Sequence, residues 1–165
     1  MTNTDFTPLM IQQFRLRIFD ESYPRILKCL DLLNEDQVWE RPNEQLSSVG
    51  NLVLHLAGNV RQWINSGLGG HEDTRKRGRE FLESSRCSKW KLKLLLEDLK
   101  RDVEVVLKKL TAEDLVNVRK VQVFEESGLS ILIHVMEHFS YHTGQITWQT
   151  KMLSNVDTKY YGTLS

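Results

Sequence analysis

The 165-residue sequence has little of several features that would by themselves indicate a fold or a location. It contains only two cysteines, Cys29 and Cys87, and no CxxC pair, so we expect free thiols in a reducing compartment. No segment has about 18 consecutive apolar residues, which argues against a membrane-spanning helix. The first residues lack the charged region and apolar stretch of a signal peptide, so we expect a cytoplasmic protein without a membrane partner.

An excess of charge of either sign is also absent. Lys and Arg together number 22, as do Asp and Glu, so the formal net charge is zero. Proteins that bind duplex nucleic acid need a basic face for the phosphates, and we therefore expect no nucleic-acid partner. The densest basic run, TRKRGRE at residues 74–80, is flanked by acids, and we interpret it as a solvated loop and not as a phosphate site.

Hydrophobic residues make up 40% of the chain, enough for one core, and the length predicts a single domain over residues 1–165. Helical periodicity dominates, and the three prolines all lie within the first 42 residues. We expect four long amphipathic helices, the first of them kinked or broken by Pro24 near Ser22–Tyr23. Their expected ranges are 8–33, 47 or 48 to 67, 88–110 and 127–153, which together predict an all-α four-helix bundle.

The connections between these helices are expected to be polar. Residues 34–48 are turn-rich, with one helical turn expected at their start, and residues 67–80 suggest a long loop. The alternation around Val121 and Val123 leaves residues 117–126 open, either as an extended stretch or as a small hairpin. Trp90 is expected on the apolar face of the third long helix. Trp63 and Trp148 are expected to pack in the core, although an exposed one could equally line a dimer interface.

Histidine is scarce, yet three of the five residues, His134, His138 and His142, follow one another at steps of four within HVMEHFSYHTGQI. Residues four apart share a helix face, so each overlapping pair can reach one metal ion. A straight helix drifts by about 40° per four residues, so a third ligand must come from another helix. His55 is the candidate, because a histidine in an apolar stretch must satisfy both ring nitrogens. His71, in the charged glycine-rich loop, is expected to be exposed.

A plainer alternative remains open at this point. Any one of these histidines alone is more often a satisfied core or surface residue than a metal ligand. A degenerate site that keeps the histidines and holds no metal is a further alternative.

Two segments, SVGNLVLHLAGNVRQWI at residues 48–64 and HVMEHFSYHTGQI near the C-terminus, resemble the DinB/YfiT-like superfamily. The similarity covers nearly the whole chain and is greatest to a branch described only as domains of unknown function. The resemblance implies a divalent-metal site, for Zn, Ni or Fe, with His55, His138 and His142 as ligands, so that His134 is not a ligand. Family proteins often carry Arg where this chain has Thr143, a departure that can alter the surroundings of the ligands.

The resemblance also implies an activity. Three neutral imidazoles leave an ion with open coordination positions, as in catalytic sites. Characterised relatives are thiol-dependent transferases, so we expect a metal-dependent thiol S-transferase that adds a bacillithiol-, mycothiol- or glutathione-like thiol to a small electrophile. The resemblance further implies a homodimer. The alternative is a non-catalytic metal-binding stress or interaction protein.

No residue can be identified from the sequence as a general base, and the catalytic residues stay unassigned. Glu137 lies about 100° around the helix from His138 and is expected to face elsewhere. Asn59 follows His55 by four residues, and Tyr141 and Gln145 flank the ligand face of the last helix. We expect these three to pack or to support the ligands.

Overall fold

The computed structural model describes residues 5–82 and 85–162. The first helical rod consists of α1 (Thr7–Arg15), a π-helical segment η1 (Leu16–Ser22) and α2 (Tyr23–Leu32). Pro8 lies in the first turn of α1, where a missing amide removes no helical hydrogen bond, and Pro24 is the second residue of α2. The kink or break expected at Pro24 is instead a stretch of wider π-turns before the proline, through which the rod continues.

Each of the other three rods begins at a serine whose side chain accepts a hydrogen bond from a free backbone amide of the first turn. The predicted starts of these helices are therefore confirmed to within a residue. The second rod is α4 with its π-helical continuation η2, and the third and fourth are single helices. Their bounds are α4 (Val49–Val60), η2 (Arg61–Leu68), α5 (Lys89–Leu107) and α7 (Gly128–Ser154).

Short elements lie in the connections. The helical turn expected after the first rod is α3 (Glu35–Trp39), which has a capping box formed by Asn34 and Gln37. The loop after η2 contains a 3-10 turn, η3 (Arg77–Phe81). After α5 come a short helix that the sequence did not predict and the small hairpin that was one of the alternatives: α6 (Ala112–Val116), β1 (Val118–Val121) and β2 (Phe124–Ser127).

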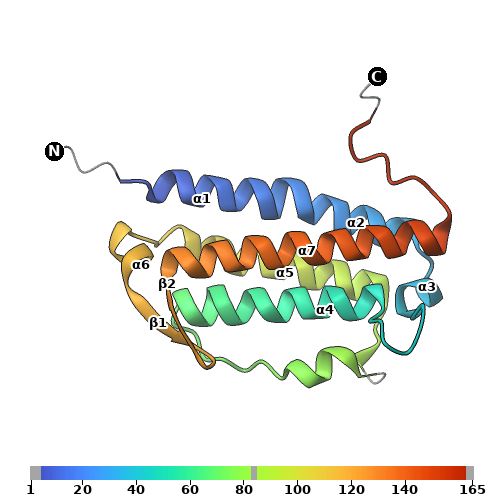
Figure 1. Cartoon of the computed structure of the whole chain (residues 1–165), viewed down its shortest axis with the longest axis horizontal. Coiled ribbons are helices and arrows are strands. Elements are labelled where there is room, and N and C mark those ends of the chain that lie inside the picture. Colours follow the sequence, from blue (N-terminus) through green and yellow to red (C-terminus); the bar gives the residue numbers. More distant parts are fainter. Residues whose placement is uncertain (1–4, 83–84, 163–165) are drawn as a thin grey trace.

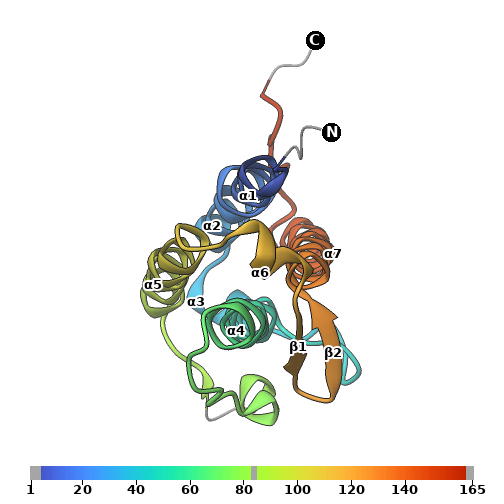
Figure 2. The ribbon, with the colours of Figure 1, turned by 90° about the vertical axis from the view of Figure 1, so that its left-hand side faces the viewer.

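The four rods lie side by side, and Figure 2, which views them end-on, shows them around a common centre. α7 contacts both the first rod and α4, and α5 contacts α4, η2 and α2 on the other side. The all-α class is confirmed, and the core draws on every rod. Its largest fully buried side chains include Phe14, Ile18, Ile26, Leu30, Leu56, Ile64, Leu92, Leu96, Leu107, Ile131 and Phe139.

Two of the large aromatic residues are not where the core pattern placed them. Trp63 is buried as expected, but the side chains of Trp90 and Trp148 are 67% and 61% exposed. Trp90 lies in the first turn of α5, about 200° around the helix from the fully buried Leu92, and therefore on its solvent face. Trp148 lies on the outer face of α7, on the same side of the helix as the exposed Tyr141.

The structure also bears on the cysteines and on the expected lack of a membrane-spanning helix. Cys29 is buried and Cys87 half-buried, and both are free thiols. Within residues 5–82 and 85–162, none of the helices combines the length and the apolar character needed to cross a bilayer.

Close packing where α6 meets the start of α7 generates a prediction about stability. A Cβ atom on Gly128 would lie 2.1 Å from the backbone carbonyl oxygen of Asp114, so Gly128→Ala forces backbone atoms apart. We expect it to lower the free energy of unfolding by about 1–3 kcal/mol, as overpacking does. The matched control is Gly144→Ala on the same helix, where a Cβ meets no atom within 4 Å. There alanine's helix propensity should raise stability by about 0.5–1 kcal/mol. Urea denaturation followed by circular dichroism measures both, and equal effects would contradict the packing argument.

Candidate metal centre

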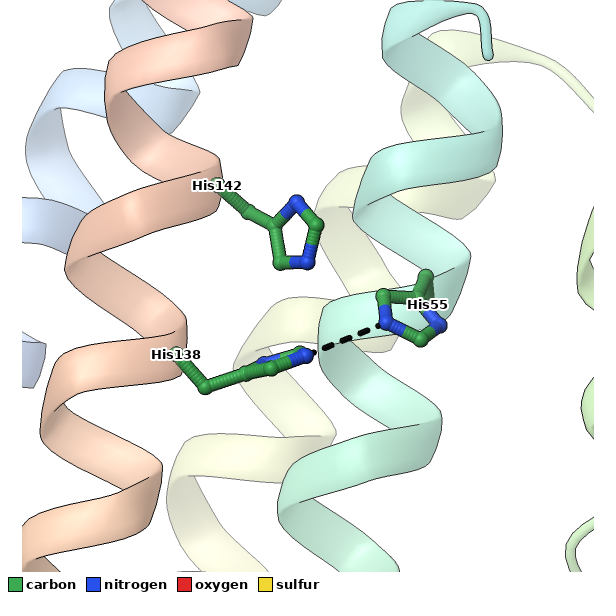
Figure 3. Close-up of side chains that lie close together, drawn as sticks. All are labelled: His55, His138 and His142. Carbon is green, nitrogen blue, oxygen red and sulfur yellow. Dashed lines mark hydrogen bonds between the residues drawn. The ribbon is translucent and has the colours of Figure 1, made fainter.

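The three histidines implied as ligands lie together between two antiparallel rods. α4 and α7 run side by side in opposite directions (Figure 1), with His55 on α4 and both His138 and His142 on α7. Figure 3 shows the three imidazole rings turned toward one another across the gap between these helices. Their ring centroids are 5.0 Å (His55–His138), 5.0 Å (His55–His142) and 4.5 Å (His138–His142) apart.

The separations between ring nitrogens fit a first coordination shell. The Nε2 atoms of His55 and His138 are 3.1 Å apart, and one ring nitrogen from each of the three histidines lies within 4.8 Å of the others. Two nitrogens at about 2.0–2.1 Å from a tetrahedral zinc ion are about 3.3 Å apart. The His55–His138 pair therefore already has the spacing of one tetrahedral edge, and His142 offers a third ring nitrogen within 4.8 Å of both.

His55 is oriented by a buried carboxylate. Its Nδ1 lies 2.8 Å from Oε2 of Glu80, which only accepts hydrogen bonds when ionised, so Nδ1 carries the hydrogen and Nε2 has its lone pair free. Nη2 of Arg75 is also 3.1 Å from this Nδ1, but both atoms carry hydrogens in that tautomer, so this contact is not a hydrogen bond. A carboxylate bound to the outer nitrogen of a histidine is the usual support of a metal ligand.

Glu80 is itself held by several groups. Arg75 donates from Nε to Oε1 at 2.7 Å and from Nη2 to Oε2 at 3.0 Å, and Asn51 on α4 donates to the Glu80 backbone carbonyl at 2.9 Å. Burial acts to raise the pKa of Glu80, but the hydrogen bonds from His55 and Arg75 more than offset this, and the pKa is lowered. Gly58 leaves the room for this pair, since a Cβ there would lie 2.2 Å from Oε1 of Glu80.

His142 has a neutral partner in place of a carboxylate. Its Nδ1 donates to Oε1 of Gln145 at 2.7 Å, and Gln145 donates in turn to the hydroxyl of Tyr141 at 3.1 Å. The supporting role expected of Gln145 and Tyr141 agrees with these contacts. Nδ1 of His138, by contrast, is buried and has no hydrogen-bond partner among the described residues.

All three α7 histidines are held in the neutral form that metal ligation requires. Burial is the main cause, and it lowers the pKa of His134, His138 and His142. The pKa of His138 falls to about 3, chiefly because the ring is buried, and the neighbouring His142, His55, His134 and Arg75 further disfavour a positive charge on it. A neutral imidazole with an available lone pair is the form that binds a divalent ion.

The other residues singled out from the sequence have different surroundings. The ring of His134 packs against Trp63 in a tilted arrangement, with 4.0 Å between ring centroids, and lies outside the three-histidine group. His71 and Glu137 are exposed, as expected. Asn59 is buried, and its Oδ1 has no partner within the described part of the chain. Thr143 is also buried, and its hydroxyl donates to the Phe139 carbonyl within α7.

The three histidines line a cleft of about 680 Å³, together with Phe81, Tyr141 and Trp148. His55 at its inner end is 6% exposed, whereas His138 and His142 are half-buried, so the nitrogens remain accessible from the cleft. A larger cavity of about 870 Å³ is bordered by Arg75 and Glu80 but by none of the three histidines. The arrangement can therefore hold a divalent ion with positions open to a small molecule.

Sequence reasoning missed Glu80 and Arg75, and the interpretation of residues 74–80 as a solvated loop is wrong at these two positions. The side chains of Arg75 and Glu80 are only 6% and 10% exposed. The segment is so rich in charge that it has no apolar pattern to reveal burial. The one available signal was that a buried histidine that binds a metal usually donates its other ring nitrogen to a hydrogen-bond acceptor. This rule does not say where in the sequence the acceptor lies.

Comparisons with known proteins agree with this fold. A DinB-like protein from Bacillus subtilis is 16% identical, with a TM-score of 0.65 over 90% of this chain and 94% of its own. Another from Bacillus cereus is 16% identical, with a TM-score of 0.65 over 83% and 89%. A conserved protein from Enterococcus faecalis is 15% identical, with a TM-score of 0.71 over 93% and 99%. At these identities the likeness shows the fold alone.

No functionally curated protein matches the chain. The model of a family described as "Protein of unknown function (DUF1572)" matches residues 9–164. The chain therefore belongs to the DUF1572 family, whose function is unknown, and its fold is DinB-like.

Proposed function

We propose that this chain is a divalent-metal-binding protein that uses His55, His138 and His142 to activate a small thiol for transfer to an electrophile. The observation that supports the proposal most is the convergence of three imidazoles at the inner end of an open cleft. Structural metal sites are closed by four protein ligands, but here the described residues supply three within reach of one another. Open positions favour catalysis over a purely structural metal.

The donor set suits the expected metals. Imidazole binds Zn, Ni and Fe, so the ligands do not select one of them. When bound, such an ion would supply a Lewis acid that lowers the pKa of a coordinating thiol into the neutral range. Hydrogen bonds from His55 to Glu80 and from His142 to Gln145 keep the inner nitrogens of both rings free for this purpose.

The chain's contribution to transfer would be binding and exclusion of water. The thiol sulfur forms a bond to an electrophilic carbon, whose leaving group departs with the bonding electron pair, and the thiol proton goes to solvent. None of the described carboxylates faces the cleft as a free base, since Glu80 is paired and Glu137 is exposed elsewhere. Phe81, Tyr141 and Trp148 would cover an apolar electrophile on the open side. The homodimer implied by the family resemblance is likewise part of the proposal.

Metal binding can be tested directly. Protein purified without chelator or nickel resin should carry close to one transition-metal ion per chain by elemental analysis. His138→Ala removes one of three ligands, so it should weaken the metal by more than the about 10–100-fold that loss of a supporting partner costs. His71→Ala, an exposed histidine outside the group, should bind like the unaltered chain. Finding no stoichiometric metal, and none bound on titration, would remove the metal proposal.

The support given by Glu80 leads to a second test. Glu80→Gln keeps the size of the side chain but weakens the acceptor for His55 Nδ1, and we expect the metal to bind about 10–100-fold more weakly. Gly58→Ala should act in the same direction, because its Cβ occupies the space of the Glu80 carboxylate. The control is Glu137→Gln, an exposed carboxylate next to His138. Titration against a chromophoric chelator measures all three variants. Unchanged affinity in both Glu80→Gln and Gly58→Ala would show that the carboxylate does not support the ligand.

Transfer can be measured with monochlorobimane and a low-molecular-weight thiol. Fluorescence of the conjugate should form faster with metal-loaded protein than without it, and His138→Ala should abolish the acceleration because the ion is no longer held. His71→Ala should retain it. Equal rates with and without His138 would rule out the transferase while leaving metal binding standing.

A further inference from the structure

The charge of the residues that line the cleft in front of the histidines is of one sign, and that sign is positive. Among the described residues that line it there is no Asp or Glu, and Arg77 is the one Lys or Arg. The larger neighbouring cavity differs, because its lining includes acids such as Glu72 and Asp102 as well as basic residues. A negatively charged ligand would therefore meet no repulsive carboxylate in the histidine cleft.

Arg77 is also free to bind. It forms no ion pair or hydrogen bond through its side chain with any residue in the described ranges, whereas the nearby Arg75 is fully engaged by Glu80 and Gln62. An arginine without a partner at the wall of a concave site retains all five guanidinium donors for a ligand. Its planar fork matches a carboxylate with two parallel hydrogen bonds.

Arg77, an exposed residue, belongs to the same short turn as the carboxylate that supports His55. It is the first residue of the 3-10 turn η3, which also contains Glu80. Glu80 is tied to His55 through its side chain and to Asn51 through its carbonyl. The loop that orients the His55 ring therefore also sets the start of η3, where Arg77 lies.

We propose that the cleft selects a thiol that carries a carboxylate, with the carboxylate paired to Arg77 while the sulfur lies at the histidine end. This inference rests on the proposed function, since it assumes that a thiol binds at the three histidines. It adds the class of thiol and a residue that determines specificity. The volume of about 680 Å³ accommodates a small molecule of this kind. A single guanidinium neutralises one carboxylate, whereas a phosphate dianion would need further donors.

The test compares two thiols of equal length, 3-mercaptopropionate and 3-mercapto-1-propanol. Cobalt-substituted protein is titrated with each, and the near-ultraviolet band that a thiolate gives on cobalt reports binding. Arg77→Gln should weaken 3-mercaptopropionate about tenfold, the worth of one charge-assisted hydrogen-bonded contact, and leave 3-mercapto-1-propanol within about twofold. Arg77→Lys should restore part of the difference, because it keeps the charge but not the fork.

Arg79→Gln is the matched control, because Arg79 is an exposed arginine of the same turn that lines the other cavity and not this one. It should leave both affinities unchanged. If both thiols bind and Arg77→Gln lowers their affinities equally or not at all, the inference fails while the thiol proposal stands. If neither thiol produces the band, the thiol proposal fails and the inference fails with it. An equal loss in Arg79→Gln would also overturn it, since the effect would then be one of general charge.

Discussion

The hydrogen bond between Glu80 and His55 is the interaction on which the rest of the site depends. A carboxylate that is only 10% exposed is tolerated because His55 and Arg75 both donate to it, and removal of either donor would leave a buried charge without full compensation. The same bond decides which nitrogen of His55 is free, and it fastens a charged loop to α4. The same hydrogen bond therefore fixes both the orientation of the His55 ring and the position of the loop that carries Glu80. A change that releases this loop also frees the His55 ring.

Much of the fold could be predicted because its signals are local. Serines before apolar periodic runs mark the starts of α4, α5 and α7, since a free amide needs a nearby acceptor. Two features gave no such signal: α6 is only five residues long, and the hairpin turns at Gln122 with φ of +57°, where glycine or asparagine is usual. The exposure of Trp90, by contrast, follows from the helical period, because this residue lies about 200° around α5 from the fully buried Leu92.

The three histidines of the site could also be predicted from the sequence. The spacing of His138 and His142 follows from helix geometry, and an apolar neighbourhood singled out His55, so the convergence of α4 and α7 was a consistent expectation. The supporting residues were not predictable in the same way. Glu80 lies 25 residues after His55, in a run of alternating charges, and becomes buried only because Gly58 leaves room for it. No pattern in the segment itself distinguishes Glu80 and Arg75 from the exposed charges beside them.

The three histidines are not equivalent in what they require. Glu80 and Gln145 already hold a hydrogen on Nδ1 of His55 and His142, so these rings present their lone pairs without rearrangement. The Nε2 atoms of His55 and His138 are 3.1 Å apart, and two neutral rings at that distance share a proton, which His138 must donate because His55 has none there. A divalent ion needs the lone pairs of both atoms, so that proton has to move to Nδ1 of His138. This nitrogen is buried and lacks an acceptor among the described residues, and the cost of preparing the site therefore falls on His138.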